Sequence, residues 1–366
     1  MQEKDGKYIF GVVKGMALAK MRRHWIDNLR WATVLLVLLY HVIYFYNNKG
    51  VIGGMGGFGD GPQYQDVVMY ILYPWFMPLL FILAGISAKY ALDRHSPREW
   101  FKMRTRKLLV PSTIGLFFIG AAIGRINTMI SPAVDTIDPL PFGIKYMIWA
   151  LSGTGPLWFI QDLWLFSIVL LIVRKMDSKG RFMTLCSHAG MTTVILMGLL
   201  FWLGHQTLIM EPDPASAEGL WNLYKPIFYL IPFLMGYFVF SHDRVQDDLG
   251  RSWIPLMLSS SVSGVVLTMT GFGQDNTLPQ YLCSPLNNIY GWLMCLAMMG
   301  WFKACFDRTG RFAGYMTRSS YGIYIVHYSI IAVFGYMMKI DGYLCSFLSN
   351  RGESRTIFIH TRIIYM

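Results

Sequence analysis

Two side chains in the first apolar segment, Arg30 and His41, are separated by ten uncharged residues, WATVLLVLLY. Eleven residues make about three turns of an α-helix, so both side chains leave the same face, about 16 Å apart along the axis. Neutral histidine can take a proton near pH 7, and arginine can bind phosphate. The spacing therefore predicts a proton acceptor inside the segment and an anion site at its mouth.

Ionisable side chains at membrane depth are costly and usually face a cavity. In this chain only His41, Asp162 and His327 lie well inside apolar segments, and His205 lies at the edge of one. His327 is about 12 Å into the last segment, counted from the same side as Arg30. We therefore expect the two histidines to meet at similar depth.

Each of these residues also allows a structural role. His327 could simply hydrogen-bond a neighbouring helix, and Asp162 could be solvated or paired with the adjacent Gln161. Arg30 could anchor the segment at the membrane surface, neutralised one turn earlier by Asp27. The residue types alone leave these alternatives open.

The elements that must position these side chains are apolar helices. Hydrophobic residues make up 54% of the 366 residues and charged residues 14%, whereas about a quarter of a soluble domain is charged. Apolar runs of this length between short polar loops are typical of membrane-spanning helices. The sequence predicts an all-α polytopic membrane protein with about nine spans, at residues 31–47, 67–88, 108–124, 155–173, 189–206, 226–240, 253–271, 285–302 and 320–338.

The net charge of +11 follows the loops. If the N-terminus is cytoplasmic, 24 Lys and Arg residues lie on the inner side and five on the outer side, which is the asymmetry expected of inner loops. The excess charge therefore indicates an anionic lipid surface or an anionic cytosolic ligand, and argues against nucleic acid. We expect a multi-pass protein of a bacterial cell membrane, whose first span is an uncleaved insertion signal.

Three regions are predicted: a cytoplasmic N-terminal segment (1–24), one membrane domain (25–338) and an atypical tail (339–366) with too many charges to cross a bilayer. The five cysteines are scattered and show no C-x-x-C spacing, so no metal site is expected.

Five motifs, in this order, resemble the acyltransferase 3 family of integral-membrane O-acyltransferases. Arg30 and His41 match its Arg, ten residues, His signature. Ala84-Gly85 stands where the family usually has Ser-Gly, and Arg104 with Lys107 stands where it has Arg-x-x-Arg. The motifs read WIDNLRWATVLLVLLYH (25–41), PWFMPLLFILAGISAKYAL (74–92), FKMRTRKLLVPSTIG (101–115), GPLWFIQDLWLF (155–166) and SSYGIYIVHYSII (319–331). The chain is also similar to the glucan-modifying branch, exemplified by the glucans biosynthesis succinyltransferase, and members usually have about ten helices.

The resemblance implies that acetyl-CoA or succinyl-CoA donates an acyl group from the cytosol to a hydroxyl of a glycan or similar acceptor at the outer face. His41 would be the general base. Its catalytic partners would be Arg30, His327 and Asp162. Arg30, Arg104, Arg106, Lys107 and Tyr321 would bind acyl-CoA, and Asp27, Trp158 and Gln161 would contact the substrates.

Within this scheme, Asp27 would orient Arg30, and His327 or Tyr321 would polarise the thioester carbonyl. The competing class is a proton-coupled transporter or flippase of a polar or anionic metabolite, which also needs buried His and Asp residues. Against transport, the sequence shows no inverted repeat and only one carboxylate within a span. The oligomeric state is left open.

Overall fold

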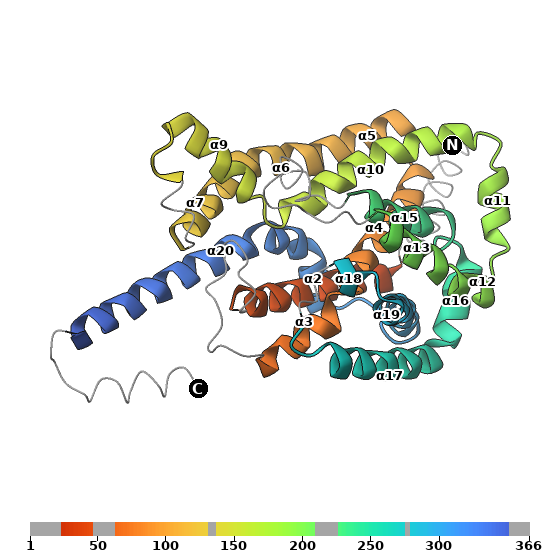
Figure 1. Cartoon of the computed structure of the whole chain (residues 1–366). Coiled ribbons are helices and arrows are strands. Elements are labelled where there is room, and N and C mark those ends of the chain that lie inside the picture. The colour runs from red at the N-terminus through yellow and green to blue at the C-terminus, as the bar shows by residue number, and fades with distance from the viewer. Residues whose placement is uncertain (1–22, 47–62, 131–136, 209–225, 275–278, 351–366) are drawn as a thin grey trace.

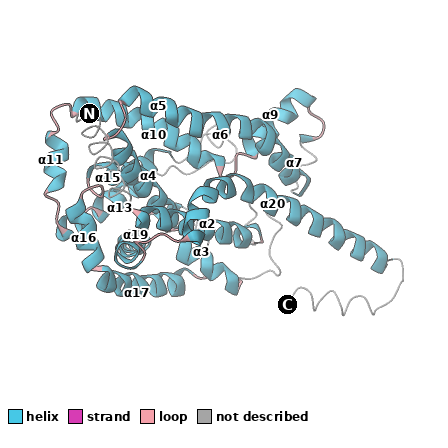
Figure 2. Cartoon of the chain, turned by 180° about the vertical axis from the view of Figure 1, so that it is seen from behind, coloured by secondary structure: helices cyan, strands magenta, loops and turns pink. Residues whose placement is uncertain are grey.

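The computed structural model describes residues 23–46, 63–130, 137–208, 226–274 and 279–350. These residues form helices joined by turns and short loops, and no strand occurs among them (Figure 2). The predicted all-α class is confirmed. Helix α19 (Pro285–Cys305) is largely buried, and α2, α13, α16 and α17, labelled in Figure 1, lie around it.

The first half of the described chain contains α2 (His24–Phe45), α3 (Val67–Leu72), α4 (Phe76–Leu92), α5 (Pro97–Arg104), α6 (Val110–Gly115), α7 (Ala121–Ile130), α9 (Phe142–Ser152) and α10 (Leu157–Met176). The second half contains α11 (Arg181–Ser187), α12 (Met191–Leu196), α13 (Gly198–Leu208), α15 (Pro226–Phe238), α16 (Asp243–Arg251), α17 (Trp253–Gly271), α18 (Pro279–Leu282), α19 and α20 (Arg311–Asn350).

Seven helices of the described chain are long and apolar enough to cross a membrane. They are His24–Phe45, Tyr64–Leu92, Pro97–Met129, Leu157–Met176, Met191–Leu208, Trp253–Gly271 and Arg311–Met338. The other two predicted spans form α15, which is apolar but shorter, and α19, which has 21 residues and is largely buried. The chain is therefore a polytopic helical membrane protein.

A single rod runs from Pro97 to Ile130, at the top of Figure 1. It begins with a capping box, in which Ser96 accepts a bond from the Glu99 N–H and the Glu99 carboxylate accepts one from the Ser96 N–H. Pro97 fits the first helical position because its missing N–H would have no partner there. Thr105–Leu109 and Leu116–Gly120 are π-helical turns, which often occur near functional sites.

The second predicted span is broken between α3 and α4, at Tyr73–Trp75. The break frees the Ile71 carbonyl, which accepts hydrogen bonds from the Trp75 indole and the Tyr290 hydroxyl, both at 2.7 Å. Irregular backbone at membrane depth is tolerated where the protein supplies such partners.

Helices α4 and α15 touch along their backbones through two glycines. A Cβ atom on Gly85 would lie 2.1 Å from the Phe233 carbonyl oxygen, and one on Gly236 would lie 2.2 Å from the Ile82 carbonyl oxygen. Small residues at such crossings let two membrane helices approach closely. This contact holds α4 against the middle of the bundle.

Helices α2 and α20 cross beside a small apolar cluster. Phe45 and Ala332 are both fully buried there, and Gly335 lies against the Phe45 ring. Beyond this crossing α20 projects away from the other helices, as both Figure 1 and Figure 2 show. It continues past the predicted domain boundary at residue 338 to Asn350.

Candidate active site

The two histidines predicted to meet do so where α2 and α20 cross. His41 Nδ1 and His327 Nε2 are 3.2 Å apart, and the ring centroids are separated by 5.1 Å. These residues are 286 positions apart in the chain, so only the helix crossing brings them together.

The main-chain partners of the two rings decide where their protons lie. His327 Nδ1 is 2.7 Å from the Tyr324 carbonyl oxygen, and His41 Nδ1 is 2.8 Å from the Val37 carbonyl oxygen. A carbonyl oxygen only accepts, so both Nδ1 atoms must carry hydrogen. His327 Nε2 is then an acceptor facing the His41 Nδ1–H, and His41 Nε2 retains a free lone pair. We assign the tautomers on this basis.

Tyrosine rings pack around the pair. Tyr40 and Tyr328 meet His41 edge-on, with centroids 5.5 and 5.4 Å away. Tyr324 lies 5.6 Å from His327 and donates its hydroxyl hydrogen to the Pro156 carbonyl oxygen at 2.8 Å. His327 is buried, whereas His41 is only half-buried. The more accessible imidazole is therefore the one with the free lone pair.

Arg30 lies on the same helix as His41 and is held from two sides. It donates to Asp27 Oδ1 at 3.1 Å and to Ser87 Oγ at 2.6 Å. Ser87 in turn donates to the Leu83 carbonyl oxygen at 2.7 Å. The side chain remains 36% exposed, so its guanidinium is fixed in direction and still reachable.

Arg104 is the member of the predicted basic motif that turns into the bundle. Its Nε donates to Ser167 Oγ at 3.2 Å, and its guanidinium lies over the Trp100 ring at 5.2 Å. Arg30 is close enough to act on it electrostatically. Arg104 Nη2 is buried without a hydrogen-bond partner among the described residues. A buried unpaired donor on a cation favours an anionic ligand.

The other residues expected to bind acyl-CoA lie differently. Arg106 and Lys107 are exposed, so they are available at the surface near Arg104. The Tyr321 hydroxyl donates to the Lys107 carbonyl oxygen. This hydrogen bond connects α20 to the basic motif. Because the Tyr321 hydroxyl hydrogen is already donated there, Tyr321 is less suited to polarising a thioester than we expected.

Asp162 is 0% exposed, and neither of its carboxylate oxygens has a hydrogen-bond partner in the described structure. Neither solvation nor pairing with Gln161 therefore accounts for it here. Trp158 and Phe166 lie one turn before and after Asp162 on α10, and they pack on Tyr229 and Phe233 of α15 at 5.4 and 5.7 Å. The carboxyl group therefore lies on the side of α10 that faces α15.

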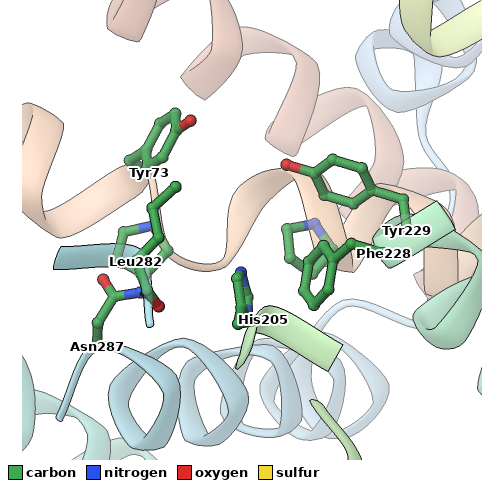
Figure 3. A pocket seen from close by; sticks show the side chains of 8 residues that line it. Tyr73, His205, Phe228, Tyr229, Leu282 and Asn287 are labelled. Atoms are coloured by element: carbon green, nitrogen blue, oxygen red, sulfur yellow. Dashed lines mark hydrogen bonds between the residues drawn. The ribbon is translucent and has the colours of Figure 1, made fainter. Parts of the chain in front are cut away.

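A small polar cavity lies at the break between α3 and α4 (Figure 3). Tyr73, Tyr229 and His205 line it, with the Tyr229 ring and the His205 imidazole on one side and Asn287 on the other. Its volume is about 10 Å³, which is room for one water molecule at most. In this form the cavity is too small for a sugar or a CoA arm.

Sequence reasoning missed the two serines that hold the arginines. Ser87 and Ser167 each donate to the carbonyl four residues earlier, Leu83 and Leu163, and each accepts from an arginine. Both serines lie in apolar helices, where a hydroxyl must find such partners. The signal in the sequence was the serine itself, because a hydroxyl within an apolar span can accept a hydrogen bond from a cation far away in the chain.

A family model described as an acyltransferase domain matches residues 23–355. The match covers the whole predicted membrane domain, including Arg30, His41, Arg104, Asp162 and His327. No significant match was found among curated proteins or solved structures.

Proposed function

The chain belongs to the acyltransferase 3 family and is a membrane acyltransferase, and we propose that it moves an acetyl or succinyl group from cytosolic acyl-CoA to a hydroxyl of a glycan or similar acceptor at the outer face. The main support for this proposal is the contact between His41, which lies on the same helix as Arg30, and His327 of α20. The family match supports an acyltransferase over a proton-coupled transporter.

His41 is the general base in this proposal. Its Nε2 takes the proton of the acceptor hydroxyl while the oxygen attacks the thioester carbonyl. The tetrahedral intermediate then collapses, the carbon–sulfur bond breaks, and the imidazolium returns the proton to the leaving CoA thiolate. The products are an ester and CoA with a free thiol, and His41 is neutral again.

His327 is a positioning residue for this step. Both of its ring nitrogens are engaged, Nδ1 with the Tyr324 carbonyl oxygen and Nε2 with His41. Together with the Val37 carbonyl oxygen, it therefore holds the His41 hydrogen on Nδ1 and orients the ring, which leaves Nε2 free, as the third member of a nucleophile–base–orienter set does. This role replaces the expectation that His327 polarises the thioester.

The donor lies at the cytoplasmic end. Arg30 and Arg104 present like charges to the same region, and a bound phosphate group would relieve their repulsion and satisfy the free Nη2 of Arg104. Arg106 and Lys107 add positive charge at the entrance. Acetyl-CoA and succinyl-CoA both carry the phosphates that such a cluster would bind, with the acyl group directed toward His41.

The acceptor reaches His41 from the opposite side. The unpartnered carboxyl group of Asp162 offers a hydrogen-bond acceptor to a sugar hydroxyl. Trp158 and the half-buried Gln161 lie on the same stretch of α10. An aromatic ring beside polar side chains suits a sugar, and we place the reaction in a cell membrane with a glycan as acceptor.

The proposal is tested with His41→Ala. We expect acylated envelope glycan, measured by mass spectrometry, to fall at least 100-fold, in line with the ~10²–10⁴-fold contribution of general bases. Acetyl-CoA or succinyl-CoA should still protect the purified variant against heat, because the arginines that bind the phosphates are unchanged.

The matched control is His188→Ala, which removes an exposed histidine from the loop after α11 and should leave acylation unchanged. Wild-type acylation by a normally expressed His41→Ala protein would remove the proposed base. Absence of donor protection in the wild type, together with a proton-dependent flux of substrate in vesicles, would favour the transporter.

A further inference from the structure

A groove lies on the side of the bundle away from the histidine pair, between α12–α13 and the N-terminal half of α19. It encloses about 420 Å³, within the range of about 300–1,000 Å³ common for ligand sites. None of its lining side chains is charged. They are Ile195, Leu196, Leu199, Trp202, Pro285, Asn288, Ile289, Trp292 and Leu293, together with Gly198.

The walls of the groove are fixed by two indole groups. Trp292 Nε1 donates to the Val194 carbonyl oxygen, and Trp202 Nε1 donates to the Cys283 carbonyl oxygen, each at 3.0 Å. Gly198 leaves room for the floor, because a Cβ atom there would lie 2.7 Å from the Trp292 ring. The groove is therefore built into the packing of α13 against α19.

One buried polar side chain, that of Asn288, is among the residues that line this apolar groove. Asn288 is 2% exposed, and its Nδ2 donates to the Leu282 and Ser284 carbonyl oxygens at 2.8 and 2.9 Å. Its Oδ1 has no hydrogen-bond partner among the described residues. An unpaired buried acceptor costs about 1–3 kcal/mol, so a ligand with an N–H or O–H donor is favoured.

The length and depth of the groove fit a membrane lipid. Trp202 to Ile195 spans about 10 Å along α12–α13, most of one leaflet of a hydrocarbon core about 30 Å thick. Asn288 lies three residues into α19, about 4.5 Å below its start, where a lipid headgroup can reach. The predicted topology puts this end at the outer face.

We propose that this groove binds one acyl chain of a phosphatidylethanolamine molecule of the outer leaflet, with the headgroup ammonium donating to Asn288 Oδ1. The uncharged lining gives no attraction for an anionic headgroup, and a choline headgroup has no N–H to donate. The site is independent of the acyl-transfer chemistry.

The test uses purified, delipidated full-length protein reloaded with an equal mixture of phosphatidylethanolamine and phosphatidylcholine that carry identical chains. Native mass spectrometry counts the lipids that stay bound. We expect one phosphatidylethanolamine per wild-type chain, retained at least fivefold over phosphatidylcholine. Leu199→Trp should lose it, because the indole fills the groove.

Leu200→Trp is the matched control, since Leu200 is equally exposed on the same helix but does not line the groove, and it should retain the lipid. Ile289→Trp repeats the test from the α19 wall in case Leu199→Trp folds poorly. Equal retention by the groove variants and the control, or equal retention of the two lipids, would overturn the proposal.

Discussion

The carbonyl of Tyr324 controls the chemistry of the histidine pair. By accepting the Nδ1 hydrogen of His327, it turns His327 Nε2 toward His41 as an acceptor. His41 Nδ1–H thus has two acceptors, the Val37 carbonyl oxygen and His327 Nε2, and both leave His41 Nε2 as the basic nitrogen. Loss of the His327 lone pair would remove the acceptor that comes from the other helix and would loosen the orientation of the His41 ring.

At this scale we predict that His327→Phe lowers kcat about 10- to 100-fold, a fraction of the ~10²–10⁴ typical of a general base. The flat ring preserves packing but cannot accept the His41 Nδ1–H. His327→Gln should recover part of the rate, because its side-chain oxygen can accept that hydrogen. The measurement is kcat together with the Kd for acyl-CoA, and the Kd should not change.

A purely structural role for His327 would give a different pattern. Both variants would then lose thermal stability and activity in parallel, and the glutamine would give no recovery. Tyr328→Phe, which keeps the ring against His41, serves as a neighbour that should leave kcat within a factor of about two, since that ring contributes packing only.

Among the elements, the pairing of α4 with α15 has little tolerance for larger side chains, because the two backbones meet at Gly85 and Gly236. α4 carries Ser87, which holds Arg30, and α15 carries Tyr229, which lines the polar cavity. The spacing of these helices therefore affects both ends of the proposed reaction path.

We predict that Gly236→Ala destabilises the protein by about 1–3 kcal/mol, the usual cost of overpacking, because the new Cβ would lie 2.2 Å from the Ile82 carbonyl oxygen. The change is measured as a lower Tm in detergent. Gly314→Ala, on the open face of α20, should raise stability slightly, because alanine is favoured over glycine within a helix by about 1 kcal/mol. Equal Tm values for the two variants would contradict this reading.

On the scale of the whole molecule, the predicted orientation in the membrane depends on the Lys and Arg residues at the ends of the helices. Cys305 is exposed at the end of α19 that follows Lys303, whereas Cys295 is buried within the same helix. The distribution of Lys and Arg predicts that Cys305 lies on the cytoplasmic side.

We predict that a variant retaining only Cys305 is not labelled by a membrane-impermeant maleimide in intact cells and is labelled after lysis. A variant retaining only Cys295 should stay unlabelled in both cases until the protein is denatured. Labelling of Cys305 in intact cells would reverse the orientation and place the arginines at the outer face.

The sequence by itself determined the helical class, the positions of most spans and the candidates Arg30 and His41, because hydropathy and helical spacing are local properties. It also predicted that His327 would reach the depth of His41. Only the tertiary structure decided which nitrogens meet, that Arg104 turns inward to Ser167 while Arg106 stays exposed, and that Asp162 has no hydrogen-bond partner within the described part of the chain. Those facts depend on contacts between helices far apart in the chain, where the packing of large side chains sets the distance and direction of each polar group.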